Sequence, residues 1–215
     1  MSFFINNTNP NRPGPMTGNP LNGICEKVLI ETTKVFDACV SQTTETGIIL
    51  PVTGFNPENP TLPLTFVSAQ NAPGESVVVS DIVIDRIDSS PNYANVSLTV
   101  TIPVTVTYRD ANGVLGTGSS SVTVNKSVML FVPQPALTPV NITATAIFSS
   151  QIGTFTGENI FTVTGCIQIM IKVTSVVDIL IPSYGYPVVP PCQAAPESSA
   201  CRGLQNLPLY PTAQN

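Results

Sequence analysis

The stretch that decides the fold is VSLTVTIPVTVTY, at residues 96–108. Its even positions are apolar or aromatic, and its odd positions are Ser, Thr and one Pro. Side chains alternate between the two faces of a β-strand, so this period of two predicts a long, half-buried strand with a Thr-rich outer face. Pro103 lies on the polar side and cannot donate a ladder hydrogen bond, which predicts a sheet edge or a bulge there.

The residues after this stretch predict a hairpin. Residues 109–113 read RDANG, and Asn-Gly is a strong signal for a tight turn between two strands. The alternation resumes over residues 122–132, where Lys126 interrupts the apolar face. The sequence therefore predicts an antiparallel pair of long strands.

Strand patterns also dominate the rest of the chain. The best helical candidate, residues 26–40, is rich in β-branched residues and is better explained as extended. The expected fold class is all-β, an antiparallel sandwich or open barrel of about eight to ten strands with extended N- and C-terminal arms. Further strands are expected at 24–36, 38–50, 64–69, 76–88, 140–149, 153–164 and 166–181.

Proline marks the expected boundaries of the chain's parts. Residues 1–23 are rich in Pro, Gly and Asn, and predict a flexible N-terminal arm. Residues 187–215 form a Pro-rich tail that carries two cysteines. The β domain is expected at 24–186, with a seam at 51–63, where four prolines cluster.

The chain is poor in charge. Charged residues make up 10% of it, against roughly 25% in an average soluble domain. The net charge of −5 and the 8 scattered basic residues argue against binding to nucleic acid or to anionic lipid. Little charge repulsion remains to keep copies of the protein apart.

The residue types needed for catalysis are scarce, so an enzyme is not expected. The chain has no histidine, which excludes the usual Ser-His-Asp and Cys-His pairs. Asp81, Asp85 and Asp88 form one acidic cluster, but alternation places Asp88 on the face opposite the other two, so a solvated strand is expected. No catalytic, cofactor-binding or metal-binding residues are assigned, and no cofactor is expected.

The five cysteines are the candidate cross-linking residues. They contain no CxxC pair, and their odd number leaves at least one thiol free or bonded to another molecule in an oxidising environment. Disulfides are favoured for the two cysteines of the tail, whereas for Cys166 an inert buried thiol and a cross-link remain equal alternatives. The candidates are Cys25, Cys39, Cys166, Cys192 and Cys201.

The order of elements from residue 75 to residue 184 resembles the SPOCS-type domain of bacterial spore-coat morphogenetic proteins. The resemblance rests on VVVSDIV at 77–83, the strand 96–108, YRDANG at 108–113, FVP at 131–133 and IMIKVT at 169–174. The segment 24–39, ICEKVLIETTKVFDAC, is similar to the start of spore-associated proteins of spore-forming Firmicutes. The chain departs from the morphogenetic proteins in lacking a peptidoglycan-binding module.

This resemblance implies a structural role in the spore envelope. The expected location is the spore surface, reached after lysis of the mother cell, because residues 1–7 lack the features of a secretory signal peptide. The expected partners are copies of the chain itself and other spore-envelope proteins, with no nucleic acid and no membrane. The alternative is a surface binding module or adhesin for a glycan or protein receptor.

The mechanism expected for assembly combines the arm with the cysteines. The N-terminal arm, with Cys25 and Cys39 at its base, is expected to reach a neighbouring copy by adding a strand or lying in a groove. Disulfides then lock the contact. A head-to-tail contact that does not close gives a fibre, and a two-dimensional coat or exosporium lattice is the competing geometry.

Overall fold

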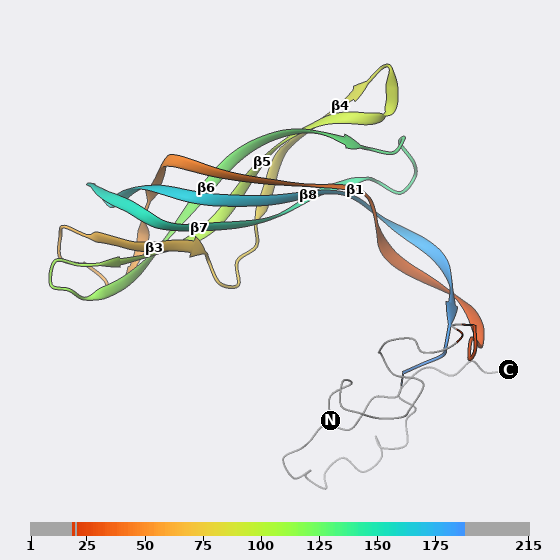
Figure 1. Cartoon of the computed structure of the whole chain (residues 1–215), viewed down its shortest axis with the longest axis horizontal. Helices are drawn as coiled ribbons and strands as arrows, with labels where there is room; N and C mark the ends of the chain where they lie inside the picture. The colour runs from red at the N-terminus through yellow and green to blue at the C-terminus, as the bar shows by residue number, and fades with distance from the viewer. Residues whose placement is uncertain (1–18, 20, 188–215) are drawn as a thin grey trace, which may run out of the picture. The chain divides into compact units, whose positions relative to one another are not determined.

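The computed structural model describes residue 19 and residues 21–187. The chain forms two compact units, Thr32–Val177 and the two chain ends, of which residues 19, 21–31 and 178–187 are described. The fold of the described residues is all-β, a single antiparallel sheet of eight strands that is not closed (Figure 1). The strands are β1 (Glu26–Pro51), β2 (Thr53–Asn56), β3 (Thr65–Asn71), β4 (Val78–Ile87), β5 (Ser90–Arg109), β6 (Leu115–Phe131), β7 (Asn141–Gly157) and β8 (Ile160–Ser183).

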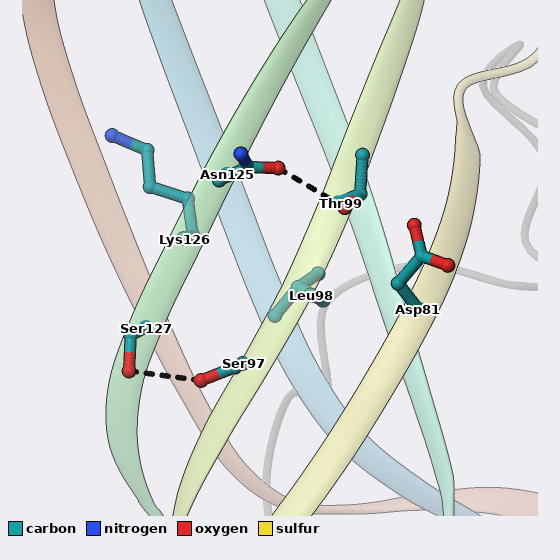
Figure 2. A pocket seen from close by; sticks show the side chains of 7 residues that line it. All are labelled: Asp81, Ser97, Leu98, Thr99, Asn125, Lys126 and Ser127. Atoms are coloured by element: carbon teal, nitrogen blue, oxygen red, sulfur yellow. Dashed lines mark hydrogen bonds between the residues drawn. The ribbon is translucent and has the colours of Figure 1, made fainter.

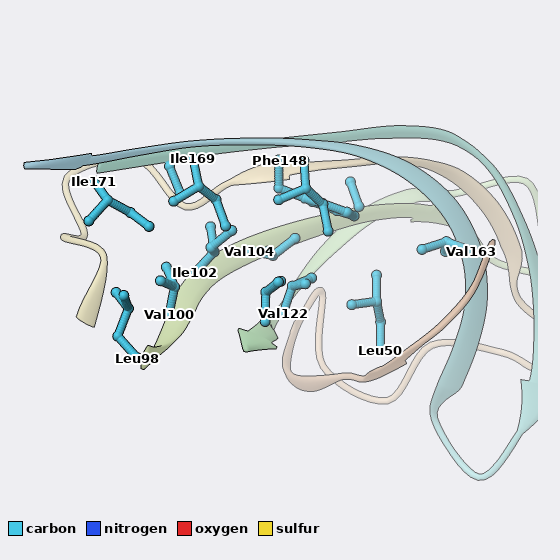
Figure 3. Close-up of a cluster of buried hydrophobic side chains, with 14 of the residues drawn as sticks. Leu50, Leu98, Val100, Ile102, Val104, Val122, Phe148, Val163, Ile169 and Ile171 are labelled. Atoms are coloured by element: carbon cyan, nitrogen blue, oxygen red, sulfur yellow. The ribbon is translucent and has the colours of Figure 1, made fainter. Parts of the chain in front are cut away.

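The sheet folds over itself, so that two groups of strands face each other. Its order is β1-β8-β7-β3-β5-β6-β2, and β4 pairs with β5 beside the position of β3. In Figure 3, Val100 and Ile102 of β5 point toward the layer that carries Ile169 and Ile171 of β8. The arrangement is sandwich-like, as the sequence predicts, with the short strand β3 joining β5 of one layer to β7 of the other.

The core follows the alternation of β5. Every even position of β5 from 94 to 108 is buried, including Val96, Ile102 and Tyr108, which have no exposed surface. The opposite layer supplies the odd positions of β8, such as Ile169 and Ile171, which are equally buried. Burying an aliphatic side chain of this size contributes about 1.5–3 kcal/mol, so this double row is the main source of stability.

Pro103 lies in the middle of β5, an interior strand of the sheet. Of the two settings expected for it, a sheet edge or a bulge, the sheet edge is wrong. On one side β5 pairs with β4 up to Thr101, and it pairs with β3 from Val104 onward. The carbonyl of Pro103 accepts from the N–H of Ala72 at 2.9 Å on that same side. Pro103 lacks an N–H at the point of β5 where pairing with β4 has ended and pairing with β3 has not yet begun. No hydrogen bond of the sheet is therefore lost.

The predicted hairpin at RDANG is confirmed. Tyr108 pairs with Gly116 and Arg109 with Leu115 across the turn. Asp110 organises the turn, because its Oδ1 accepts from the N–H of Asn112 at 2.9 Å and of Val114 at 2.8 Å. Gly116 is required by its partner, since a Cβ there would lie 2.5 Å from the Tyr108 ring.

Several of the expected strand boundaries are wrong: β7 also runs through 150–152, and β8 runs through residue 165, where breaks were expected. Strands expected at 24–36 and 38–50 form one continuous strand, β1, across Asp37. The strand expected at 153–164 is instead divided by a hairpin, because Gly157, Glu158 and Asn159 all adopt positive φ. The Pro-rich segment 51–63 holds β2, which pairs with β6 in the same sheet, and Val52 is buried in the core.

Asp37 tolerates its place inside β1 because its carboxylate replaces backbone pairing. The Oδ1 atom accepts from the N–H of Ala38 at 2.8 Å, and Oδ2 accepts from the N–H of Phe131 at 2.8 Å. Phe131 ends β6, whose edge on this side pairs only with β2 and only as far as Ser119 among the described strands. Asp37 thus links the edges of the two layers on one side of the sandwich.

Asn71 makes the corresponding link on the other side. Strand β3 pairs with β7 at only two positions, Ala69 with Ser150 and Gln70 with Ser149. The side-chain amide of Asn71 then continues the ladder, because Nδ2 donates to the carbonyl of Ala146 at 2.9 Å and Oδ1 accepts from the N–H of Phe148 at 2.7 Å. The Asn71 side chain therefore satisfies two backbone groups of β7 at positions where β3 no longer pairs with it.

Replacing Asn71 with Ala is expected to lower the free energy of unfolding by about 1–3 kcal/mol, because it leaves a partly buried carbonyl and N–H without their partner. Urea unfolding of the full chain measures this change. The matched control is Asn141→Ala on the exposed end of β7, which should stay within about 0.5 kcal/mol of the parent. An Asn71→Ala loss no larger than the control's would contradict the linking role.

Candidate assembly surface

The outer face of β5 and β6 is a ladder of hydroxyl and amide groups. Ser97 Oγ donates to Ser127 Oγ at 3.0 Å, and Thr99 Oγ1 donates to Asn125 Oδ1 at 3.0 Å (Figure 2). Thr101 and Thr123 continue the series with hydroxyl oxygens 3.4 Å apart. These rows are polar and uncharged, so a second surface that contacts only these rows desolvates no ion. Asp81 and Lys126 lie beside them.

A shallow hollow of about 270 Å³ lies beside this ladder. Ser80 pairs with Thr99 and Val83 with Ser97, so Asp81 and Ile82 together form a bulge opposite Leu98. Asp81 has φ of 51° and lines the hollow with Thr99 and Asn125 (Figure 2). Bulges re-aim side chains, and here the bulge breaks the strict alternation from which the faces of Asp81 and Asp85 were inferred.

Large apolar side chains are exposed along β4 and on the outer face of the other layer. In β4, Val78 is 56% exposed and Val83 is 59% exposed. In the opposite layer Val40 of β1 and Ile147 of β7 are 59% and 63% exposed. Within the described chain β4 pairs only with β5, and β1 pairs only with β8. Unpaired strand edges next to exposed apolar side chains are templates for association with another chain.

The structure places three of the five candidate cysteines, and all three are free thiols. Cys166 lies on the outward face of β8 and is exposed, which removes the alternative of a buried thiol. Its Sγ lies 3.5 Å from Thr44 Oγ1 of β1. Cys192 and Cys201 lie outside the described residues.

Cys39 has a different environment from Cys166. It lies inside β1, half-buried, and packs against the core. Burial raises the pKa of the Cys39 thiol, and the nearby Asp37 carboxylate raises it further. The thiolate is the nucleophile in disulfide exchange, so Cys39 is poorly suited to rapid cross-linking.

Cys25 lies just before the first residue of β1 and is exposed. Its N–H and its Sγ both donate to the carbonyl of Ser183, at 3.0 Å and 3.4 Å. The backbone bond fixes how β1 and β8 begin to pair at this end of the strands. The thiol is nevertheless accessible for a bond to another molecule.

Sequence reasoning missed the features that depend on tertiary contacts. No periodic pattern in the sequence predicts the bulge at Asp81 or the hydrogen bonds that Asp37 and Asn71 make to other strands. Only the Thr-rich outer face of β5 was visible in advance. Within residues 19 and 21–187 the structure has no cluster of three or more metal-ligating side chains, and no helix of the described chain is long and apolar enough to span a membrane.

Comparison of the chain with protein-family models, with curated proteins and with solved structures finds no match in any of the three.

The thiol of Cys39 is expected to react more slowly with a maleimide than that of Cys166, in full-length variants that keep one cysteine each. The raised pKa also moves the rate profile of Cys39 to higher pH in the folded protein than in the same variant unfolded in urea. Because the folded state disfavours the thiolate, this group stabilises the fold less as pH rises above the pKa of the unfolded thiol. Coincident folded and unfolded profiles would contradict this assignment.

Proposed function

We propose that the protein is a structural subunit that assembles with copies of itself into a polymer of the spore surface. The observation that carries the proposal is the open sheet: the described parts of β1 and β4 each have one strand edge without a neighbouring strand. Exposed apolar side chains flank both edges. The low charge of the chain leaves little repulsion to oppose the contact.

Disulfides between copies are the second part of the proposal. The thiols of Cys25 and Cys166 are free and exposed, so they are accessible to a second molecule without unfolding. Two thiols lose two protons and two electrons to an oxidant such as molecular oxygen, and one S–S bond forms. Such oxidation suits a surface exposed to air and not a reducing cytosol.

The assignment to the spore envelope rests on the resemblance of residues 24–39 and 75–184 to spore-associated proteins. The product would be an appendage fibre if the contact is head-to-tail and does not close, and a coat or exosporium lattice if contacts extend in two directions. Other spore-envelope proteins are further partners under this proposal. Residues 1–23 are proposed to reach the neighbouring copy, although all but a few of them lie outside the described residues.

A second candidate function, a surface binding module, is favoured by one observation. The hollow beside Asp81 is lined by hydroxyl and amide groups together with Lys126 and Leu98, and the Nδ2 of Asn125 has no acceptor in the described chain. Such groups suit a hydroxyl-rich ligand such as a glycan. A monomeric protein that binds a surface glycan would favour this function over assembly.

Electrophoresis in SDS tests the disulfides directly. Assemblies boiled without reductant are expected to run as multimers, and the same sample with reductant as a 22.7 kDa monomer. Replacing Cys25 and Cys166 by Ser should reduce the multimers, whereas replacing Cys39 should leave them unchanged. Non-reduced material that already runs as a monomer would show that the intermolecular disulfides are wrong.

Deleting residues 1–23 is expected to abolish polymerisation while leaving a folded β domain. Circular dichroism and urea unfolding report the fold of the truncated chain, and light scattering reports its assembly. Unchanged polymers from the truncated chain would overturn the role of the arm and leave the strand edges as the site of association.

A further inference from the structure

The first residues of β1 form an unusually exposed part of the sheet. Residues 26–31 of β1 and 178–183 of β8 belong to the unit made by the chain ends, where each strand has only the other as its described neighbour. Leu29 is 69% exposed and Leu180 is 63% exposed. Two strands alone are marginally stable in water, and these two leave apolar side chains uncovered. Within the described residues, no third strand covers this ribbon.

The backbone shows which groups of β1 are free to pair. The N–H of Cys25 donates to the carbonyl of Ser183, so the backbone groups of Cys25 point toward β8. Backbone direction alternates along a strand, and the N–H and C=O groups of residues 26, 28 and 30 consequently point to the open edge. A strand added at this edge would exchange hydrogen bonds with Val28 and Ile30.

The side chains of this edge are complementary to themselves. Lys27, Leu29 and Glu31 are alternate residues on one exposed face, and neither Lys27 nor Glu31 has an ion-pair partner within the described chain. When two copies of the strand lie antiparallel about a two-fold axis at Leu29, Lys27 of each copy faces Glu31 of the other. Leu29 then faces its own counterpart, and Val28 and Ile30 form the hydrogen-bonded pairs.

We propose that β1 carries a two-fold interface in which residues 27–31 of two copies pair edge to edge. The charge pattern favours a second copy of the chain as the partner. When the same strand lies antiparallel to this edge, both Lys27–Glu31 ion pairs and the contact between the two Leu29 side chains form together. Opposite charges across an antiparallel pair stabilise it, and like charges destabilise it. The contact is isologous, so it closes into a dimer by itself.

This inference rests on the proposed self-assembly only in that the partner is another copy. A two-fold contact adds no length to a fibre without a second, different interface. Dimers joined in this way would be the repeating unit of the polymer, and the contact at β1 could be lost while other contacts still build fibres.

Cysteine cross-linking of the full chain tests the register. The five native cysteines are replaced by Ser, and Lys27→Cys, Leu29→Cys and Glu31→Cys are introduced one at a time. The two-fold register predicts that Leu29→Cys links to itself on mild oxidation, since directly opposed residues of this pair bring their Cβ atoms to about 4.5–5.5 Å. Lys27→Cys and Glu31→Cys should each stay monomeric alone and link when mixed.

A charge reversal supplies the second measurement, in the Leu29→Cys background. Lys27→Glu should slow the cross-linking at least about tenfold, because it replaces two attractive pairs by two repulsive ones. The double variant Lys27→Glu with Glu31→Lys restores the pairs and should restore the rate. Leu137→Cys, on the exposed segment between β6 and β7, is the control for random collision.

The outcomes separate this inference from the proposed function. A Leu29→Cys chain that links no faster than the Leu137→Cys control overturns the interface. That result includes the case in which residues 1–18 or 188–215 of the same chain cover the edge. Fibres that form from such a chain would leave the proposed function intact. Efficient, charge-dependent linking in a protein that forms only dimers would support the interface and contradict the polymer.

Discussion

The burial of the apolar row of β5 against the row of β8 is the constraint on which the rest of the structure depends. Side chains such as Ile102 and Ile169 are withdrawn from water only because both strands keep strict alternation over long stretches. A shift of either strand by one residue would turn its apolar set outward. The register of the neighbouring strands, the turn at Asp110 and the break between β3 and β4 all follow from keeping this double row intact.

A sheet folded in this way cannot pair all of its edges. Side chains satisfy some of the backbone groups at these edges. Asp37 accepts a hydrogen bond from the N–H of Phe131 at the end of β6, and Asn71 bonds to two backbone groups at the edge of β7. The first residues of β1 and the outer side of β4 have no such substitute in the described chain. Charged side chains can protect an exposed edge, but at the start of β1 Lys27 and Glu31 have opposite signs and would attract a second copy in reversed register. We propose that these edges associate with other copies of the chain.

The sequence predicted what local periodicity controls and missed what distant contacts control. The alternation at residues 96–108 was sufficient for the all-β class, the long strand and the hairpin that follows it. The continuity of β1 through Asp37 was not predictable, because the bond that permits it joins residues far apart in the chain. The hairpin at Glu158 and Asn159 was missed because the residue types on either side are equally typical of strand. The exposure of Cys39 and Cys166 could be assigned only after the structure showed which face of β1 and of β8 each thiol lies on.

An open sheet, accessible thiols and a self-complementary strand edge together support the proposal that the protein is a subunit that assembles with its own copies. Negative-stain electron microscopy of the purified full chain tests its central claim most directly. The account predicts fibres or sheets with a regular repeat at micromolar concentration. A field of separate, uniform particles of monomer size, under oxidising conditions and with residues 1–23 present, would contradict it.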